Sequence, residues 1–385
     1  MTAVEYFVDG LKQRGVRWVA TLCGHGLDPF YEAAQRAGLR LIDVRNEQTA
    51  GYMAGAAGRL TRRPGVVAVS SGVAHVNALS GVADASMDGA PMLLVSGAAA
   101  VRTQGMGHFQ DLDQVALAAP VTVYARVVDC ADRVLEILDA AFAAALEGPG
   151  PAHITFPMDM QTAEVAPDRL LRPAPRAPRR CAEGDPEAAA AALARARQPL
   201  VVAGSGVYYA GSGPALVEFC ERYAIPFVIP IWDRGCADRR VESFMGVIGA
   251  ATGGPRLLPE ADCIVMAGAA PDYRVGYLQP GAVRADATVV WLTTGWAELP
   301  ALYERAGGRA HREWLEEARR RREHFRNAVW ESGERQSGGR THAIHIIRAL
   351  RETLSDEAIL LIDGGSIGQW AHQLLCDRYP GHWLT

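Results

Sequence analysis

Apolar and polar positions alternate in blocks along the first 165 residues. Short runs rich in β-branched residues are each followed by glycine, proline or a helical pattern of apolar positions. The runs that we predict as strands are 18–22, 41–44, 65–69, 92–96, 121–127 and 153–156. Strands that alternate with helices are typical of a parallel sheet covered by helices, so the pattern predicts an α/β domain over residues 1–165.

The composition changes at residues 166–184. This segment contains four prolines and five arginines, a composition that disfavours the interior of both helices and strands. We therefore predict a solvated, extended linker between two domains. Binding of an acidic partner by the arginines is the alternative interpretation.

A second α/β pattern covers residues 185–335 and predicts a Rossmann-like domain. It opens with an alanine-rich helix at 186–197. A charged helix over 311–330 follows later, and its apolar residues keep helical spacing. The predicted buried strands are 200–203, 226–230, 263–267 and 288–292.

A third pattern begins at residue 341. It predicts a helix to residue 353, a strand over 358–362 and a turn at Asp363-Gly364-Gly365-Ser366. One helix and one strand bury too little apolar surface to fold as a domain. We expect residues 341–385 to be the incomplete beginning of a further domain, or a segment that docks on another chain.

Length and charge narrow the functional classes. A chain of 385 residues is longer than a domain with one ordinary hydrophobic core. The net charge of −4 and the pI near 6.2 give no basic surface for nucleic acid. Apolar residues make up 49% of the chain, and no window approaches the roughly 18 apolar residues of a membrane span. We expect a soluble multidomain protein whose partners include neither nucleic acid nor a membrane.

The N-terminus and the cysteines indicate a cytoplasmic protein. The first residues lack the basic and then apolar stretch of a secretory signal. The seven cysteines never stand at C-x-x-C spacing, so they predict neither a disulfide framework nor a zinc site. We predict no metal-ligating residues within this chain.

Two short motifs follow the first predicted strands. Gly24-His25-Gly26 comes after the first strand, where glycines let a loop approach a ligand closely. A tight strand-to-helix turn is the alternative interpretation. Glu47 comes after the second strand, where a helix of small residues begins. Open α/β sheets bind ligands at this edge, although a glutamate here also suits the positive end of the helix dipole.

Further motifs follow these two in a specific order. They are SSGVAHVN (70–77), GVADA (81–85), APMLLVSG (90–97), FQDLDQ (109–114) and GPGPAHITFPMD (148–159). In order and spacing they resemble the pyrimidine-binding domain shared by acetolactate synthases, benzaldehyde lyase, benzoylformate decarboxylase and the 2-hydroxyacyl-CoA lyases. These enzymes use thiamine diphosphate (ThDP). The resemblance is strong over residues 1–165 and looser over the central domain, and residues 341–385 resemble the opening of the diphosphate-binding domain.

The resemblance implies catalytic roles for three residues. Glu47 matches the glutamate that hydrogen-bonds the aminopyrimidine ring of ThDP and favours the imino tautomer that deprotonates the thiazolium C2. Gln110 matches a glutamine on the substrate side of the thiazolium, where an amide can donate to a developing oxyanion. His25 lies in the loop that crosses the reaction centre and would transfer protons to or from the substrate. A solvent-facing loop histidine is the alternative for His25.

The resemblance also implies a set of cofactor contacts. In the third segment, backbone N–H groups at the start of a helix would touch the diphosphate. The implied contacts are Glu47, Gly24, Gly26, Gly72 and Asn77 in the first domain, and Gly365, Ser366 and Ile367 in the third segment. His75 matches a position that faces the pyrimidine, and His108 lies two residues before Gln110. Either histidine is a proton shuttle or an ordinary hydrogen-bonding residue.

Other cofactors follow from the resemblance as well. Mg²⁺ would bind the diphosphate, held mainly by the part of the diphosphate-binding domain that this sequence does not contain. Gly204-Ser205-Gly206 and Asp272-Tyr273-Arg274-Val275 are similar to places where acetolactate synthases bind FAD and acyl-CoA relatives bind ADP. The match is incomplete, and the alternative is a central domain that binds no nucleotide.

The leading hypothesis is an acetolactate synthase-like subunit that decarboxylates a small 2-oxo acid and ligates or cleaves a C–C bond. Active sites of the family form between the pyrimidine-binding domain of one subunit and the diphosphate-binding domain of another. The resemblance therefore implies a homo-oligomer, together with a separate chain or segment that completes the diphosphate site. A 2-hydroxyacyl-CoA or oxalyl-CoA lyase or decarboxylase is the first alternative, and a non-catalytic homologue that acts as a binding scaffold is the second.

Overall fold

The computed structural model describes residues 1–148, 150–171, 184–237, 239–334, 341–376 and 383–384. The chain divides into two compact units, Met1–Cys181 and Ala182–Thr385. The division lies within the predicted linker 166–184, of which residues 172–183 are outside the described residues. The predicted domain boundaries stay a prediction.

The first unit is built on a six-stranded parallel sheet in the order β2-β1-β3-β4-β6-β5. The strands β3 and β6 are buried along their whole length, as expected where helices cover both faces of a sheet. The strands are β1 (Trp18–Leu22), β2 (Arg40–Asp43), β3 (Gly65–Val69), β4 (Met92–Ala98), β5 (Tyr124–Val127) and β6 (Pro151–Pro157). The predicted α/β architecture is confirmed.

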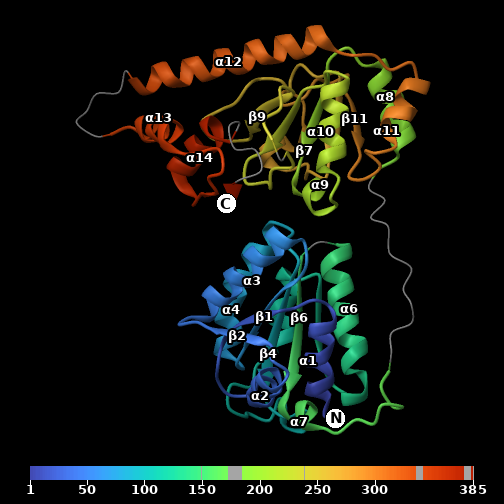
Figure 1. Ribbon diagram of the computed structural model, residues 1–385, viewed down its shortest axis with the longest axis vertical. Helices are drawn as coiled ribbons and strands as arrows, with labels where there is room; N and C mark the ends of the chain where they lie inside the picture. The colour runs from blue at the N-terminus through green and yellow to red at the C-terminus, as the bar shows by residue number, and fades with distance from the viewer. Residues whose placement is uncertain (149, 172–183, 238, 335–340, 377–382, 385) are drawn as a thin grey trace. The chain divides into compact units, whose positions relative to one another are not determined.

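Helices cover the two faces of this sheet (Figure 1). On one face, α1, α2 and α6 share a core in which the rings of Phe7 and Phe156 are 5.2 Å apart. On the other face, α3 and α4 pack closely against each other. The helices of this unit are α1 (Ala3–Gln13), α2 (Asp28–Arg36), α3 (Glu47–Thr61), α4 (Val73–Met87), α5 (Gln114–Ala118), α6 (Val134–Glu147) and α7 (Met158–Thr162).

Two glycines allow the close packing of α3 on α4. Gly51 of α3 faces Gly81 of α4, and a Cβ on Gly81 would lie only 2.6 Å from the carbonyl carbon of Gly51. No real Cβ atom is found so close to a backbone carbon. The absence of side chains at both positions therefore sets the distance between the two helices.

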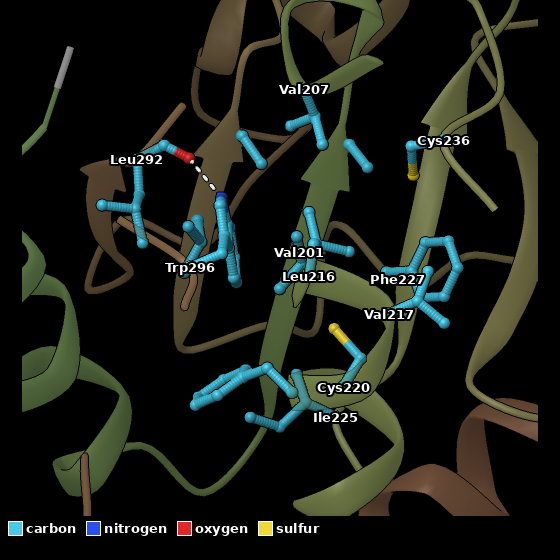
Figure 2. Packing of buried hydrophobic residues seen from close by; sticks show 14 of the residues in the cluster. Val201, Val207, Leu216, Val217, Cys220, Ile225, Phe227, Cys236, Leu292 and Trp296 are labelled. Carbon is cyan, nitrogen blue, oxygen red and sulfur yellow. Dashed lines mark hydrogen bonds between the residues drawn. The ribbon is translucent and has the colours of Figure 1, made fainter. Parts of the chain in front are cut away.

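The second unit contains a five-stranded parallel sheet in the order β11-β10-β7-β8-β9. Figure 2 shows its core, where Val201 and Phe227 of the sheet pack with Leu216. The buried Trp296 indole donates to the carbonyl oxygen of Leu292 at 3.0 Å, which satisfies its one polar atom. The strands are β7 (Pro199–Ala203), β8 (Phe227–Pro230), β9 (Phe244–Ile248), β10 (Cys263–Ala267) and β11 (Thr288–Trp291).

Among the described residues of the second unit, five α-helices precede residue 335. They are α8 (Pro186–Arg195), α9 (Ser205–Tyr209), α10 (Gly213–Arg222), α11 (Leu299–Arg305) and α12 (Arg312–Glu334). The charged α12 attaches to the core through its first turns, where Trp314 and Leu315 are buried and the Trp314 indole donates to Pro199 O at 2.8 Å. Among the described helices, none combines the length and the apolar character needed to cross a membrane.

Residues 341–376 and 383–384 belong to the same compact unit. Within it, Gln373 of α14 donates to Gly253 O at 2.5 Å, and Gln369 accepts a hydrogen bond from Ala251 N at 2.8 Å. Two very short strands pair in parallel. The elements are α13 (Ala343–Thr353), β12 (Leu360–Leu361), α14 (Gly365–Leu374) and β13 (Trp383–Leu384). That this segment opens a further domain stays a prediction.

Most strands lie within one or two residues of their predicted bounds, and two, β5 and β9, depart further from the prediction. β5 begins at Tyr124 and not at residue 121, because a short 3-10 turn contains Pro120 and the Thr122 hydroxyl donates back to Ala118 O at 2.9 Å. β9 is missing from the prediction. Its apolar run is interrupted by Gly246, and a glycine inside such a run indicates a break between strands. In the structure Gly246 lies within β9 and has a φ of 102°.

The packing of α3 on α4 can be tested with Gly81→Ala. Alanine favours a helix, but here its Cβ would overlap the backbone of Gly51, so we expect the free energy of unfolding to fall by about 1–3 kcal/mol. Urea denaturation measures the change. Gly148→Ala is the matched control, because no atom lies within 4 Å of a Cβ at Gly148. Equal stability of Gly81→Ala and the unsubstituted protein would contradict the assigned packing.

Candidate active site

Glu47 is the first residue of α3 and lies just after β2. The side chain of Asn46 caps the helix by accepting from Gln48 N at 2.8 Å, which fixes where α3 begins. The amide nitrogen of Asn77, on α4, donates to Glu47 Oε2 at 3.1 Å. Both residues lie one helical turn before the Gly51–Gly81 contact, so the packing of the two helices brings this pair together.

The 24–26 loop follows β1 and packs on the ends of β3 and β4. The carbonyl oxygen of His25 accepts from Ser70 Oγ at 2.6 Å and from Ser71 N at 3.2 Å. Gly26 has a φ of 95°, and a Cβ there would lie 3.1 Å from Ala98 N. The loop is therefore held by its backbone and tolerates no side chain at Gly26.

Gln110 lies beside the start of α4. It has a φ of 55°, and its side-chain Oε1 accepts from Ser71 Oγ at 3.0 Å. Its own backbone lies against Gly72, since a Cβ on Gly72 would be 2.9 Å from Gln110 O. Within the described residues its Nε2 has no hydrogen-bond partner, so this amide donor is free for a ligand.

Three rings gather where the 24–26 loop meets the segment before Gln110. The imidazole rings of His25 and His108 are stacked with centroids 5.8 Å apart, and Phe109 packs edge-on to His25 at 5.5 Å. Phe109 is 64% exposed. The fold therefore brings His25, after β1, to the segment of His108 and Gln110, although these residues are more than 80 positions apart in the sequence.

A cavity of about 410 Å³ lies next to Gln110 in the first unit. Its wall combines apolar side chains with glutamine amides and two carboxylates, so it suits a small ligand with both polar and apolar parts. The lining residues are Ala98, Ala99, Gln104, Gly105, Gln110, Asp111, Leu112, Asp113, Gln114, Val115, Val127 and Thr155.

The position of His75 favours the second of its two interpretations, an ordinary hydrogen-bonding residue. It is fully buried, and its Nδ1 forms a 2.8 Å hydrogen bond with Ser96 Oγ. Its ring lies 4.7 Å from that of His153. Burial lowers the pKa of His75 to about 4, and burial together with the nearby His75 lowers the pKa of His153. His75 is a core residue, whereas Asn77, two positions later, is exposed.

Two buried glutamines near the site have no role in the sequence prediction. Gln114 accepts from Gly72 N at 2.8 Å and donates to Gly97 O at 3.0 Å. Gln161 donates to Gly26 O at 2.7 Å. The partners of these side chains are far away along the chain, and only the parallel order of the strands could have suggested them.

The predicted diphosphate contacts lie in the second unit. Gly365, Ser366 and Ile367 form the exposed first turn of α14, and Gly365 has a φ of 83°. No atom lies within 4 Å of a Cβ at Gly365, so space is open in front of the helix start. Among the described residues, no group of three or more histidine, cysteine or carboxylate side chains could hold a metal ion.

The predicted nucleotide positions of the second unit are occupied by internal contacts. A Cβ on Gly206 would lie 2.8 Å from the Cα of Gly268, so this glycine serves loop packing. The Arg274 guanidinium donates to Asp272 at 2.8 Å and forms an ion pair with Asp233 at 3.0 Å. Arg274 is thus neutralised within the chain. Binding of FAD or ADP by this unit stays a prediction, without the Arg274 guanidinium as a phosphate ligand.

Family models match both units of the chain. The model of the thiamine pyrophosphate enzyme N-terminal TPP-binding domain matches residues 1–117, and the model of the central domain of the same enzymes matches residues 186–305. This chain belongs to the thiamine pyrophosphate enzyme family. The family resemblance predicted from the sequence is confirmed. The same matches support the prediction that this chain belongs to an enzyme that uses ThDP.

Individual relatives come from two branches of this family. A probable acetolactate synthase of Mycobacterium bovis is 29% identical over 399 residues, covering 97% of this chain and 71% of the relative. The 2-hydroxyacyl-CoA lyase 2 of Homo sapiens is 26% identical over 443 residues, covering 97% and 68%. A catabolic acetolactate synthase of Raoultella terrigena is 28% identical over 397 residues, covering 96% and 70%. These proteins share the thiamine pyrophosphate enzyme family but differ in their named activities.

The buried His75 of this chain predicts a loss of stability in acid. The unfolded chain protonates His75 below about pH 6.5, whereas the folded chain does so only near pH 4. The free energy of unfolding should therefore fall between these values, by on the order of 3 kcal/mol for His75.

Urea denaturation at several pH values measures this effect. His75→Gln should flatten the dependence on pH, while His345→Gln, which removes an exposed histidine of α13, should leave it unchanged. An identical pH dependence in the unsubstituted protein and His75→Gln would contradict the assignment.

Proposed function

We propose that this chain is an acetolactate synthase-like subunit that decarboxylates a 2-oxo acid and ligates or cleaves a C–C bond. The observation that carries the proposal is the hydrogen bond from Asn77 to Glu47 at the carboxyl edge of a parallel sheet. Open α/β sheets bind their ligands at this edge.

The residues at this edge suit the pyrimidine end of ThDP. ThDP supplies carbanion chemistry at its thiazolium ring when it is bound. Glu47 Oε2 is engaged by Asn77, and no other hydrogen bond to the Glu47 carboxylate is found within the described residues. Glu47 Oε1 is therefore free to share a proton with a ring nitrogen, while Asn77 fixes the orientation of the carboxylate.

Gln110 and His25 form the substrate side of the proposed site. Ser71 holds Gln110 Oε1, which leaves Nε2 to donate to an oxygen of the substrate on which negative charge develops. His25 packs against His108 and Phe109, the two residues before Gln110, and would offer a ring nitrogen for proton transfer. Gly24, Gly26 and Gly72 lie against Ser70, Ala98 and Gln110, so these glycines let the loops of the proposed site pack close to one another.

The proposed enzyme is an assembly. The first turn of α14, at Gly365, Ser366 and Ile367, offers backbone N–H groups suited to a phosphate. Mg²⁺ would bind with the diphosphate, mainly through protein outside this sequence. We therefore propose a homo-oligomer together with a chain or segment that supplies the rest of the diphosphate-binding domain, in the cytoplasm.

A second candidate activity is supported by the relatives. Proteins named 2-hydroxyacyl-CoA lyase match 97% of this chain, nearly as well as the acetolactate synthases. The second candidate is therefore cleavage or decarboxylation of a 2-hydroxyacyl-CoA or oxalyl-CoA. Parallel assays with a free 2-oxo acid and with a 2-hydroxyacyl-CoA would separate the two activities, and turnover of neither would contradict both.

Glu47→Gln tests the proposed mechanism. Glutamine keeps the size and the ability to accept from Asn77 but cannot share a proton in the same way, so turnover should fall by about 100-fold or more. The assay uses the assembled enzyme with ThDP, Mg²⁺ and a 2-oxo acid. Glu32→Gln, which removes an exposed carboxylate of α2, should keep full turnover. Unchanged turnover in Glu47→Gln would exclude Glu47 as the activating carboxylate.

A further inference from the structure

Gln114 is a buried polar residue that links three strand ends beneath the proposed site. Its side chain is 3% exposed, although it begins the short surface helix α5. It accepts from Gly72 N at 2.8 Å, and its Nε2 donates to Gly97 O at 3.0 Å and to Thr155 Oγ1 at 3.4 Å. One amide therefore ties the ends of β3, β4 and β6 to one another.

The two glycines held by Gln114 support the residues that would face the substrate. Gly72 lies against the backbone of Gln110, and a Cβ there would be 2.9 Å from Gln110 O. Gly97 lies against Gly26, and a Cβ there would be 2.6 Å from the carbonyl carbon of Gly26. A shift of Gly72 or Gly97 would therefore move Gln110 or the loop that carries His25.

Gly72 depends on Gln114 more than an ordinary helix start would. It is the N-cap of α4 with φ 57° and ψ −107°, and α4 has no side-chain cap. The Gly72 N–H is donated to Gln114, whose side chain comes from a segment 42 residues later. A buried N–H that loses its acceptor is costly, so removing the amide of Gln114 should make this turn rearrange.

We propose that Gln114 is a positioning residue that fixes the Gly72 and Gly97 backbones and thereby places Gln110 and His25 for the reaction. The proposal rests on the function proposed above. Gln114 touches neither substrate nor cofactor in this role. Its effect passes through backbone contacts, and small displacements of catalytic groups reduce turnover strongly.

Gln114→Met is the first test. Methionine has a similar length and fills the space but accepts and donates no hydrogen bond here. In the assembled enzyme, kcat should fall at least about tenfold. Tyr303→Phe is the matched control, because it removes hydrogen bonds of a buried hydroxyl in the second unit and should keep kcat. A kcat like that of the unsubstituted enzyme in Gln114→Met would overturn the proposal.

Gln114→Glu separates positioning from a general loss of stability. A protonated carboxyl can replace the amide, accepting from Gly72 N and donating to Gly97 O, whereas a carboxylate cannot donate. Burial raises the pKa of a carboxyl group, so activity relative to the unsubstituted enzyme should recover as the pH falls from about 8 to about 6. The relative activity of Gln114→Met should stay low over the same range.

Other titrating groups around this position need to be considered in that experiment. Asp111 and Asp113 lie on the same segment as Gln114, His75 faces it from α4, and His153 lies behind Thr155 on β6. All four are present in both variants, so the comparison of Gln114→Glu with Gln114→Met cancels their contribution. The same pH dependence in both variants would overturn the proposal.

Hydrogen exchange measured by mass spectrometry provides a readout without turnover. Gln114→Met should speed exchange at least about tenfold in peptides that contain Gly72 and Gly97, while peptides from β10 in the second unit keep their rates. If the unsubstituted assembly turns over no 2-oxo acid and no acyl-CoA, the proposed function fails. Exchange alone then decides about Gln114, and unchanged exchange at both glycines would overturn its role.

Discussion

The contact between Gly51 and Gly81 is the constraint on which the proposed catalytic carboxylate depends. It holds α3 and α4 close enough for their backbones to touch, and it fixes their relative position along both helix axes. One turn earlier, the same packing places Glu47 and Asn77 within hydrogen-bond distance, at 3.1 Å. Since neither polar side chain is deeply buried, the helices and not the polar pair itself keep the geometry.

The loops at the same edge of the sheet use the same principle. Backbone lies against backbone at Gly26 and Gly97, and again at Gly72 and Gln110, so these loops are fixed without large side chains of their own. Buried polar side chains, such as those of Ser70 and Gln114, then form hydrogen bonds with backbone groups of these loops. The result is a set of rigid loops with an open outer surface, which is what binding of a ligand requires.

Much of the fold could be predicted because its strands are short apolar runs with clear ends. β1, β3 and β10 begin and end where the sequence places them. β9 was missed because Gly246 interrupts its pattern, although that glycine lies within the sheet. Similarity to the thiamine pyrophosphate enzymes could assign Glu47 and Gln110, but a match by position says nothing about the partners of a side chain. Those partners, Asn77 of α4 and Ser71 in the turn before it, come from segments far away along the chain.

His75 illustrates how helical geometry decides between two interpretations that the motif leaves open. Residues two positions apart on a helix point about 200° apart, so His75 and Asn77 cannot face the same ligand. His75 shares its face with Ala78 and Val82, which are both fully buried. The spacing of these apolar residues assigns His75 to the core. Its lowered pKa is a consequence of that position and not a sign of catalysis.

The polar clusters of the two units differ in whether their side chains keep donor or acceptor atoms free for further hydrogen bonds. In the second unit, the Arg274 guanidinium is satisfied by Asp272, Asp233 and a backbone carbonyl oxygen, so the cluster stabilises its own loop. In the first unit, Ser71 engages only the oxygen of the Gln110 amide, and Asn77 engages only one oxygen of Glu47. A site that acts on a substrate needs groups that are held in place yet still able to bond. By this criterion the groups available for the proposed proton chemistry are those of the first unit, Glu47 and Gln110, and not the Arg274 cluster of the second unit.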